Sequence, residues 1–96
     1  MAMKENSIKV YDYVKENGDS NITAADIAEA TGLEVRSVNG IVTAAFQRHT
    51  IEVDGEKVPQ PLMERVPAEI ELEDKTHKQV KFIKLTEAGE NFDPRA

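Results

Sequence analysis

The stretch TAADIAEATGLEVRSVNGIVTAAFQ, residues 23–47, contains the local signals that decide the fold. Thr23 and Asp26 have the spacing of a capping box, in which each side chain satisfies a backbone amide at the start of a helix. Gly32 follows a short apolar run and suits the left-handed turn that ends a helix. Beyond this turn, apolar residues recur every three or four positions, which predicts a second amphipathic helix. The two helices are expected over 24–31 and 34–47.

The later of these helices presents short polar side chains on the face opposite its apolar stripe. Two helices joined by a tight turn that contains glycine, the second with such a face, have the helix-turn-helix arrangement. Gly40 lies in this face, although glycine inside a helix costs about 1 kcal/mol relative to alanine. One interpretation is that Gly40 lets a DNA groove approach the helix backbone. The alternative is that Gly40 packs against a neighbouring helix while the polar residues around it are solvated.

Weaker patterns extend on both sides of this stretch. A first helix is expected over 7–17, and a short extended segment at 21–23 leads into the next helix. Alternation around Asp54-Gly55 predicts a small hairpin over 50–59, because Asp-Gly favours a tight turn. A longer antiparallel hairpin is predicted over 62–86, with Glu residues of its first strand facing Lys residues of its second.

The composition favours one domain over residues 1–96, which ends in a short tail over 87–96. At 96 residues, with 40% hydrophobic and 31% charged side chains, the chain can build one core but not two. It has no cysteine, and we find no apolar run typical of a membrane span or a signal peptide. A cytoplasmic protein is therefore expected. The net charge of −6 means that any attraction to nucleic acid must come from a local patch.

Catalysis, a metal site and a cofactor are not expected. The carboxylates show no recognisable pairing for acid–base catalysis, and no glycine-rich loop suits a phosphate group. His49 and His77 lie far apart in the sequence without a cysteine nearby, which argues against a metal site.

Two further stretches resemble a known family. Leu62-Met63-Glu64-Arg65-Val66, and residues 80–89 with their LTEAG sequence, are similar to the wing and following segment of MarR-type regulators. The resemblance covers about residues 7–90. It implies an α+β winged helix-turn-helix fold, in which a three-helix core is followed by a C-terminal antiparallel β-hairpin wing. It also implies a transcriptional regulator that binds double-stranded DNA, with the third helix in the major groove and the wing on the backbone or minor groove.

The resemblance supplies candidate DNA-binding residues. They are Arg36, Ser37, Asn39, Gly40, Thr43, Gln47 and Arg48 around the third helix, and Lys75, Thr76, His77 and Lys78 at the wing tip. Arginine suits a bidentate contact to guanine and asparagine one to adenine, while serine and threonine can bond bases or phosphates. Affinity should fall as salt rises, because each neutralised phosphate releases counterions.

The chain also differs from that family. MarR-type proteins dimerise through extra helices at both ends, and too few residues lie before Ser7 and after Gly89 to build them. A single copy supplies few cations for specific binding, so a homodimer that uses the first helix or the tail is expected, with a palindromic site. The rival hypothesis is a protein-binding adaptor without DNA binding, which uses the fold as a scaffold and its acidic balance to meet a basic partner.

Overall fold

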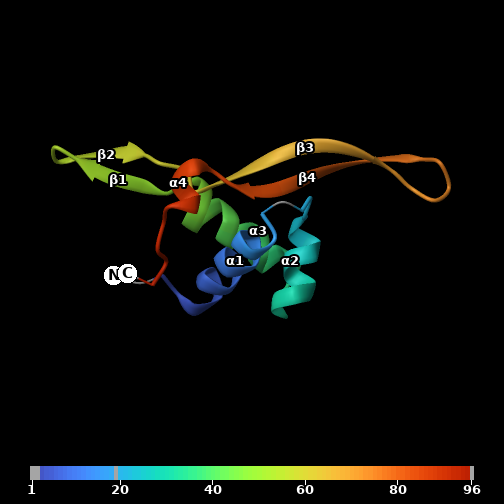
Figure 1. Ribbon diagram of the computed structural model, residues 1–96, viewed down its shortest axis with the longest axis horizontal. Coiled ribbons are helices and arrows are strands. Elements are labelled where there is room, and N and C mark those ends of the chain that lie inside the picture. The colour runs from blue at the N-terminus through green and yellow to red at the C-terminus, as the bar shows by residue number, and fades with distance from the viewer. Residues whose placement is uncertain (1–2, 19, 96) are drawn as a thin grey trace.

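The computed structural model describes residues 3–18 and 20–95 and has an α+β architecture (Figure 1). Three helices come first in the chain, and two antiparallel hairpins extend above them in opposite directions. The longer hairpin is nearer the C-terminus, and a short helix follows it. The molecule measures 54 × 25 × 22 Å, so the hairpins make it more than twice as long as it is wide. No helix in the described part of the chain is long and apolar enough to cross a membrane.

The first two helices follow local signals in the sequence. α1 spans Glu5–Glu16 and α2 spans Ala24–Thr31. The Thr23 side chain accepts a hydrogen bond from the backbone N–H of Asp26, and the Asp26 carboxylate accepts one from the N–H of Thr23. The predicted capping box is therefore present. α2 ends at Gly32, whose φ of 77° is the left-handed conformation expected there.

The third helix changes its pitch halfway along. α3 spans Val35–Ile41 and continues directly into a π-helical segment, η1, over Val42–Gln47. The N–H of Arg48 donates to the carbonyl oxygen of Thr43, five residues earlier, as π-helical geometry requires. The sequence predicts one uniform helix over 34–47, so the π-helical segment corrects that prediction. Its wider turn rotates the chain less per residue, which keeps side chains spaced at intervals of four on one face.

The core forms where these helices meet the base of the long hairpin. Val38, Val42 and Phe46 lie at intervals of four along α3 and η1, and all three are fully buried. In a uniform α-helix, positions spaced by four drift around the axis, because a turn takes 3.6 residues. The π-helical turn offsets this drift. The other buried apolar residues are Val10, Tyr11, Val14, Ile22, Ile27, Ala28, Leu62, Met63 and Ile83.

The long hairpin pairs β3, Met63–Glu71, with β4, His77–Leu85. Glu64 lies directly opposite Lys84, as expected. Further along, the directly opposite pairs are Pro67 with Lys81, Glu69 with Gln79, Ile70 with Lys78, and Glu71 with His77. The predicted ladder of Glu–Lys pairs is therefore wrong beyond the base of the hairpin, because the register places the lysines opposite proline and isoleucine.

A short segment before α2 joins the long hairpin. The N–H of Ile83 donates to the carbonyl oxygen of Ile22 at 2.8 Å. Nearby, Nζ of Lys84 donates to Oδ1 of Asn21 at 3.2 Å. The extended segment predicted at 21–23 therefore lies beside β4 and ties the start of α2 to the hairpin.

The short hairpin contributes little to the core. β1, Thr50–Val53, pairs with β2, Glu56–Pro59, through the turn at Asp54-Gly55. Both turn residues have positive φ, 52° and 83°, as the sequence signal requires. Ile51 and Val58 lie opposite each other but are 36% and 39% exposed.

The C-terminal residues fold back onto α1. α4, Glu87–Glu90, follows β4 directly. The Tyr11 hydroxyl lies 2.7 Å from the carbonyl oxygens of both Gly89 and Phe92. The N–H of Met3 donates to the carbonyl oxygen of Pro94, so the two described ends of the chain lie side by side (Figure 1). The described part of the tail that the sequence suggested for dimerisation thus contacts α1 and Met3 of its own chain.

An ion pair between α1 and the tail should make stability depend on pH. Nη2 of Arg95 lies 2.5 Å from Oδ2 of Asp12, and this hydrogen bond lowers the pKa of Asp12 below its ordinary value of 3.8. Because the folded-state pKa is depressed, the stabilisation is present above about pH 4 and is lost as the pH falls through the folded-state pKa. The two side chains are 59% and 39% exposed, so we expect Asp12→Asn to cost less than about 1 kcal/mol near neutral pH.

Urea denaturation at about pH 6 and about pH 3 checks this expectation. The difference in free energy of unfolding between wild type and Asp12→Asn should shrink at the lower pH. A difference that stays equal or grows at the lower pH would contradict the ion-pair account.

Candidate nucleic-acid interface

The open face of α3 is the first part of the candidate interface. Arg36, Ser37 and Gly40 are exposed on α3, and Ala44 is exposed in η1. Apart from the adjoining residues and the backbone of its own helix, a Cβ atom added at Gly40 would meet nothing within 4 Å. Gly40 therefore does not pack against a neighbouring helix, so the packing part of that alternative is wrong. Arg36 and Ser37 are exposed, as both interpretations require. A partner can approach the helix backbone at this position without meeting a side chain.

Along one side of the open face, Arg65 of β3 donates hydrogen bonds to three residues of the third helix. Its Nε donates to Oε1 of Gln47 and its Nη1 to Oδ1 of Asn39, both at 3.0 Å. Its Nη2 donates to the backbone oxygen of Asn39 and to the hydroxyl of Thr43, both at 3.2 Å. Asn39, Thr43 and Gln47 are each half-buried. These four residues, which we call the Arg65 cluster, bring three predicted DNA-binding side chains together around an arginine.

A basic groove lies beside the Arg65 cluster, between the start of α2 and the long hairpin. It is a hollow of about 270 Å³ lined by Thr23, Ala24, Ala25, Asn39, Arg65, Lys78, Val80 and Lys81. Three of these residues are cations and none is acidic. Within residues 3–18 and 20–95, neither Arg65 nor the two lysines form an ion pair with a carboxylate. The groove therefore keeps its positive charge.

The tip of the long hairpin is less positive than the sequence predicts. Thr76 donates its backbone N–H and its hydroxyl to the Asp74 carboxylate, and these bonds lower the pKa of Asp74. Nδ1 of His77 lies 2.7 Å from Oε1 of Glu69. Two of the four predicted tip residues are thus engaged with acidic side chains. Lys78 lines the basic groove instead.

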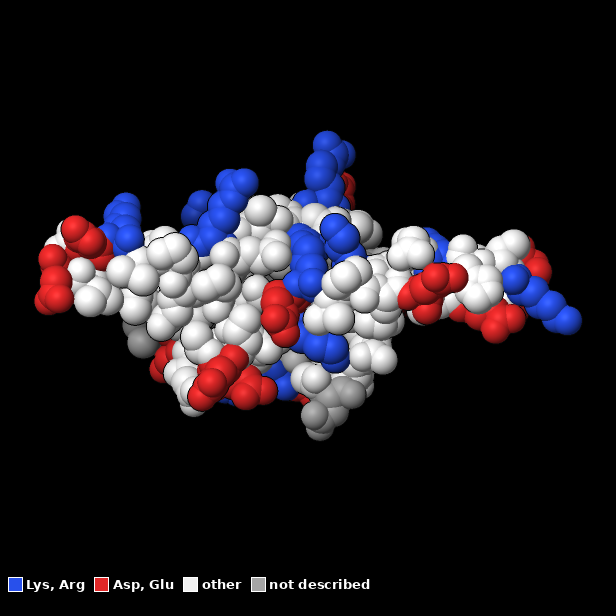
Figure 2. Space-filling view, turned by 90° about the horizontal axis from the view of Figure 1, so that it is seen from above, with Lys and Arg blue, Asp and Glu red and all other residues white. Residues whose placement is uncertain are grey.

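The charges on the surface are unevenly distributed (Figure 2). Several Lys and Arg side chains project from the upper edge of this view, whereas Asp and Glu lie at both ends, in the middle and along the lower edge. Of the remaining predicted residues, Arg48 is exposed at the end of η1, and Lys75 is exposed in the turn of the long hairpin with φ of 67°. Positive charge is therefore available only locally, as the net charge of −6 requires.

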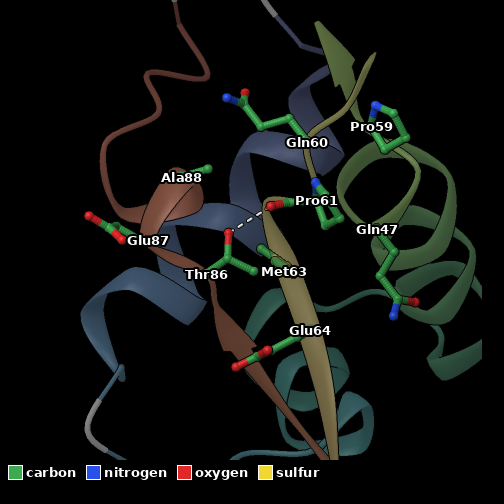
Figure 3. Close-up of a pocket in the computed structure, with 9 residues that line it drawn as sticks. All are labelled: Gln47, Pro59, Gln60, Pro61, Met63, Glu64, Thr86, Glu87 and Ala88. Atoms are coloured by element: carbon green, nitrogen blue, oxygen red, sulfur yellow. Dashed lines mark hydrogen bonds between the residues drawn. The ribbon is translucent and has the colours of Figure 1, made fainter. Parts of the chain in front are cut away.

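A larger hollow near the short hairpin has the opposite charge (Figure 3). It measures about 590 Å³ and is lined by Gln47, Pro59, Gln60, Pro61, Met63, Glu64, Thr86, Glu87 and Ala88. The Thr86 hydroxyl donates to the carbonyl oxygen of Pro61 at 2.7 Å, which ties the start of α4 to the segment before β3. The lining contains two carboxylates and no Lys or Arg. This hollow does not suit a polyanion. Apart from Gln47, which also belongs to the Arg65 cluster, its lining lies outside the candidate interface.

The two histidines occupy separate environments. Nδ1 of His49 lies 3.0 Å from the carbonyl oxygen of Gln60, and its ring packs edge-on against Phe92. His77 lies on the long hairpin beside Glu69. Among the residues that the structure describes, no three His, Asp or Glu side chains are grouped so that they could hold a metal ion.

Arg65 and Lys81 are candidate interface residues that the sequence prediction missed. Arg65 lies two positions after the buried Met63, so both point to the same face of β3, toward the helices. The strand pattern in the sequence could have identified Arg65, because it places this charged residue at an inward-facing position. Its partners lie 18 to 26 residues away in the chain, which no local pattern reveals.

Comparison with protein-family models, with curated proteins and with solved structures gives no match to this chain.

Proposed function

We propose that this chain is a winged helix-turn-helix protein, similar to MarR-type regulators, which binds double-stranded DNA and regulates transcription in the cytoplasm. The observation that carries the proposal is the open face of α3 around Gly40. In this proposal α2, the turn at Gly32 and α3 form the helix-turn-helix, and the long hairpin is the wing. A major groove can then reach the helix backbone at Gly40, with Arg36 and Ser37 beside it to contact base edges.

The basic groove supports the proposal because it places positive charge next to that face. Lys78 and Lys81 would bind phosphates, which fixes the orientation of a helix on the duplex without reading sequence. Each phosphate contact releases counterions, so affinity should fall steeply as salt rises. Few cations are available to a single copy. A homodimer on a palindromic site is therefore part of the proposal, because two copies would double the contacts.

One observation favours the adaptor as a second candidate function. A hollow of about 630 Å³ between α1 and the third helix is lined by Met3, Lys4, Asn6, Ser7, Ser37, Gly40, Ile41, Ala44 and Ala45. Most of these side chains are small or apolar, which suits a side chain of a protein partner. In the adaptor hypothesis, the same open glycine admits a protein instead of DNA.

Gly40→Gln tests whether the open face binds DNA. The new side chain would fill the space that a groove enters, so the Kd for duplex DNA should rise at least about tenfold, or about 1.4 kcal/mol. The free energy of unfolding should stay the same or rise by up to about 1 kcal/mol, since glycine is unfavourable inside a helix. Fluorescence anisotropy with labelled mixed-sequence duplexes at low salt measures the first quantity, and urea denaturation measures the second.

Ala30→Gln is the matched control, because Ala30 is exposed on α2 outside the candidate interface. It should leave DNA affinity unchanged. If the wild type binds no duplex at low salt, the DNA proposal fails and the adaptor takes its place. If Gly40→Gln binds as tightly as the wild type, the third helix is not the contact surface.

A further inference from the structure

The Arg65 cluster fixes which atoms of three side chains remain free for a partner. A guanidinium group has five N–H donors and no acceptor. The side-chain oxygens of Asn39 and Gln47 therefore face Arg65, each at 3.0 Å, and their amide nitrogens are left for other partners. The Thr43 hydroxyl also accepts from Arg65, which leaves its O–H to donate. The free polar groups of all three side chains are hydrogen-bond donors.

The charge of Arg65 reinforces this selection. Within the described ranges, Arg65 forms no ion pair with a carboxylate, so its positive charge is not neutralised locally. Each side-chain oxygen of the cluster keeps a second lone pair, yet a cation lies 3.0 to 3.2 Å away. The cation therefore repels an N–H donor that approaches one of these oxygens, and it attracts an acceptor that approaches the cluster. The oxygens are therefore poor partners for a donor on a base.

We infer that Arg65 is a specificity-determining residue that makes this flank of the interface select hydrogen-bond acceptors. The inference rests on the proposed DNA-binding function. Guanine presents two acceptors in the major groove, N7 and O6, whereas adenine presents one acceptor and the N6 donor. The oxygens of Asn39 and Gln47 already accept from a cation, so they are poor acceptors for the N6 donor in bidentate binding of adenine. Guanine is therefore preferred over adenine at the positions they contact, which reverses the adenine contact expected for Asn39 from the sequence.

The first experiment reads the base preference of the wild-type chain. Duplexes with a randomised core are selected by binding to the wild-type chain at low salt, and the selection is repeated with Asn39→Ala. The positions that depend on Asn39 are those where a base is enriched by the wild type but not by Asn39→Ala. Guanine should be enriched there. Replacing those guanines with 7-deazaguanine, which lacks the N7 acceptor, should weaken binding about tenfold. If the free donors instead bind phosphate oxygens, 7-deazaguanine will have no effect, and that result would overturn the inference.

The second experiment removes the guanidinium. Arg65→Met keeps an unbranched side chain but removes the donors and the charge, so both amides can rotate and offer their oxygens. The preference for guanine over adenine should then fall from about tenfold to near parity. A purely structural role of Arg65 would weaken binding to all duplexes equally and leave base preference unchanged. Lys57→Met, at an exposed position of the short hairpin, is the matched control and should keep the guanine preference.

Asn39→Asp covers the case in which Arg65→Met does not fold. The carboxylate still accepts from Arg65, so the cluster and the melting temperature should be maintained or improved, but the amide donors are lost. Guanine preference should disappear at the positions assigned to Asn39. Adenine enrichment by the wild type, or guanine preference retained in the folded variants, would overturn the inference while DNA binding itself stands. If the wild-type chain binds no duplex at all, the proposed function is overturned and this inference with it.

Discussion

Replacing Gly89 with alanine is expected to lower the free energy of unfolding by about 3 kcal/mol or more. A Cβ atom at Gly89 would lie 1.9 Å from the carbonyl oxygen of Leu62 and 2.9 Å from its carbonyl carbon. Moving Leu62 would strain the hydrogen bond that its oxygen accepts from the N–H of Thr86. Moving α4 would disturb the bond between the Tyr11 hydroxyl and the carbonyl oxygen of Gly89. Neither backbone can give way without losing a buried contact.

Urea denaturation followed by circular dichroism measures this loss. The total stability of such a chain is about 5–15 kcal/mol, so the variant should unfold at a much lower urea concentration. Gly18→Ala is the control, because a Cβ atom there would lie 3.6 Å from the nearest backbone oxygen, an ordinary contact. It should change stability by no more than about 1 kcal/mol. A Gly89→Ala variant as stable as this control would refute the close approach.

Phe46→Ala is expected to cost about 3–5 kcal/mol. The Phe46 side chain is 0% exposed, and its ring stacks on Tyr11 with a centroid distance of 6.1 Å. Its carbonyl oxygen also accepts from the N–H of Leu62 at 2.8 Å, which holds the backbone in place when the ring is removed. The truncation therefore leaves a cavity between α1, η1 and the long hairpin instead of a local collapse. Urea denaturation should show a lower midpoint with an unchanged m-value.

Phe92→Ala gives a comparison for the same chemical change. Phe92 is half-buried in the tail and packs edge-on against Tyr11 at a centroid distance of 6.0 Å. Because less of its surface leaves water, its truncation should cost only about 1–2 kcal/mol. Equal losses in the two variants would mean that the tail belongs to the core as fully as the third helix does.

The features that were predictable from the sequence depend on neighbouring residues. The capping box of Thr23 and Asp26 and the left-handed Gly32 set the bounds of α2, because both act within one turn of the helix. Asp54-Gly55 fixed the turn of the short hairpin for the same reason. Within the candidate interface, Gly40 was recognisable because a glycine in a helix needs an explanation, and the space around it is open.

The features that were not predictable depend on residues distant in the chain. The Arg65 cluster joins β3 to side chains up to 26 positions earlier, and only the docking of the hairpin on the third helix brings them together. The π-helical turn in η1 places Phe46 in line with Val38 and Val42, and all three are buried in the core. This turn therefore depends on tertiary packing and not on local helix preference. The register of the long hairpin, with Lys81 opposite Pro67, likewise depends on how both strands meet the core.

The two hairpins also determine how the molecule rotates in water. Both run along the long axis of a body 54 Å long and at most 25 Å across, so end-over-end tumbling is slower than spinning about that axis (Figure 1). The N–H bonds of paired antiparallel strands point across the strands, and spinning reorients them efficiently. Nuclear spin relaxation should therefore assign the hairpin amides a shorter apparent correlation time than amides whose bonds lie along the axis.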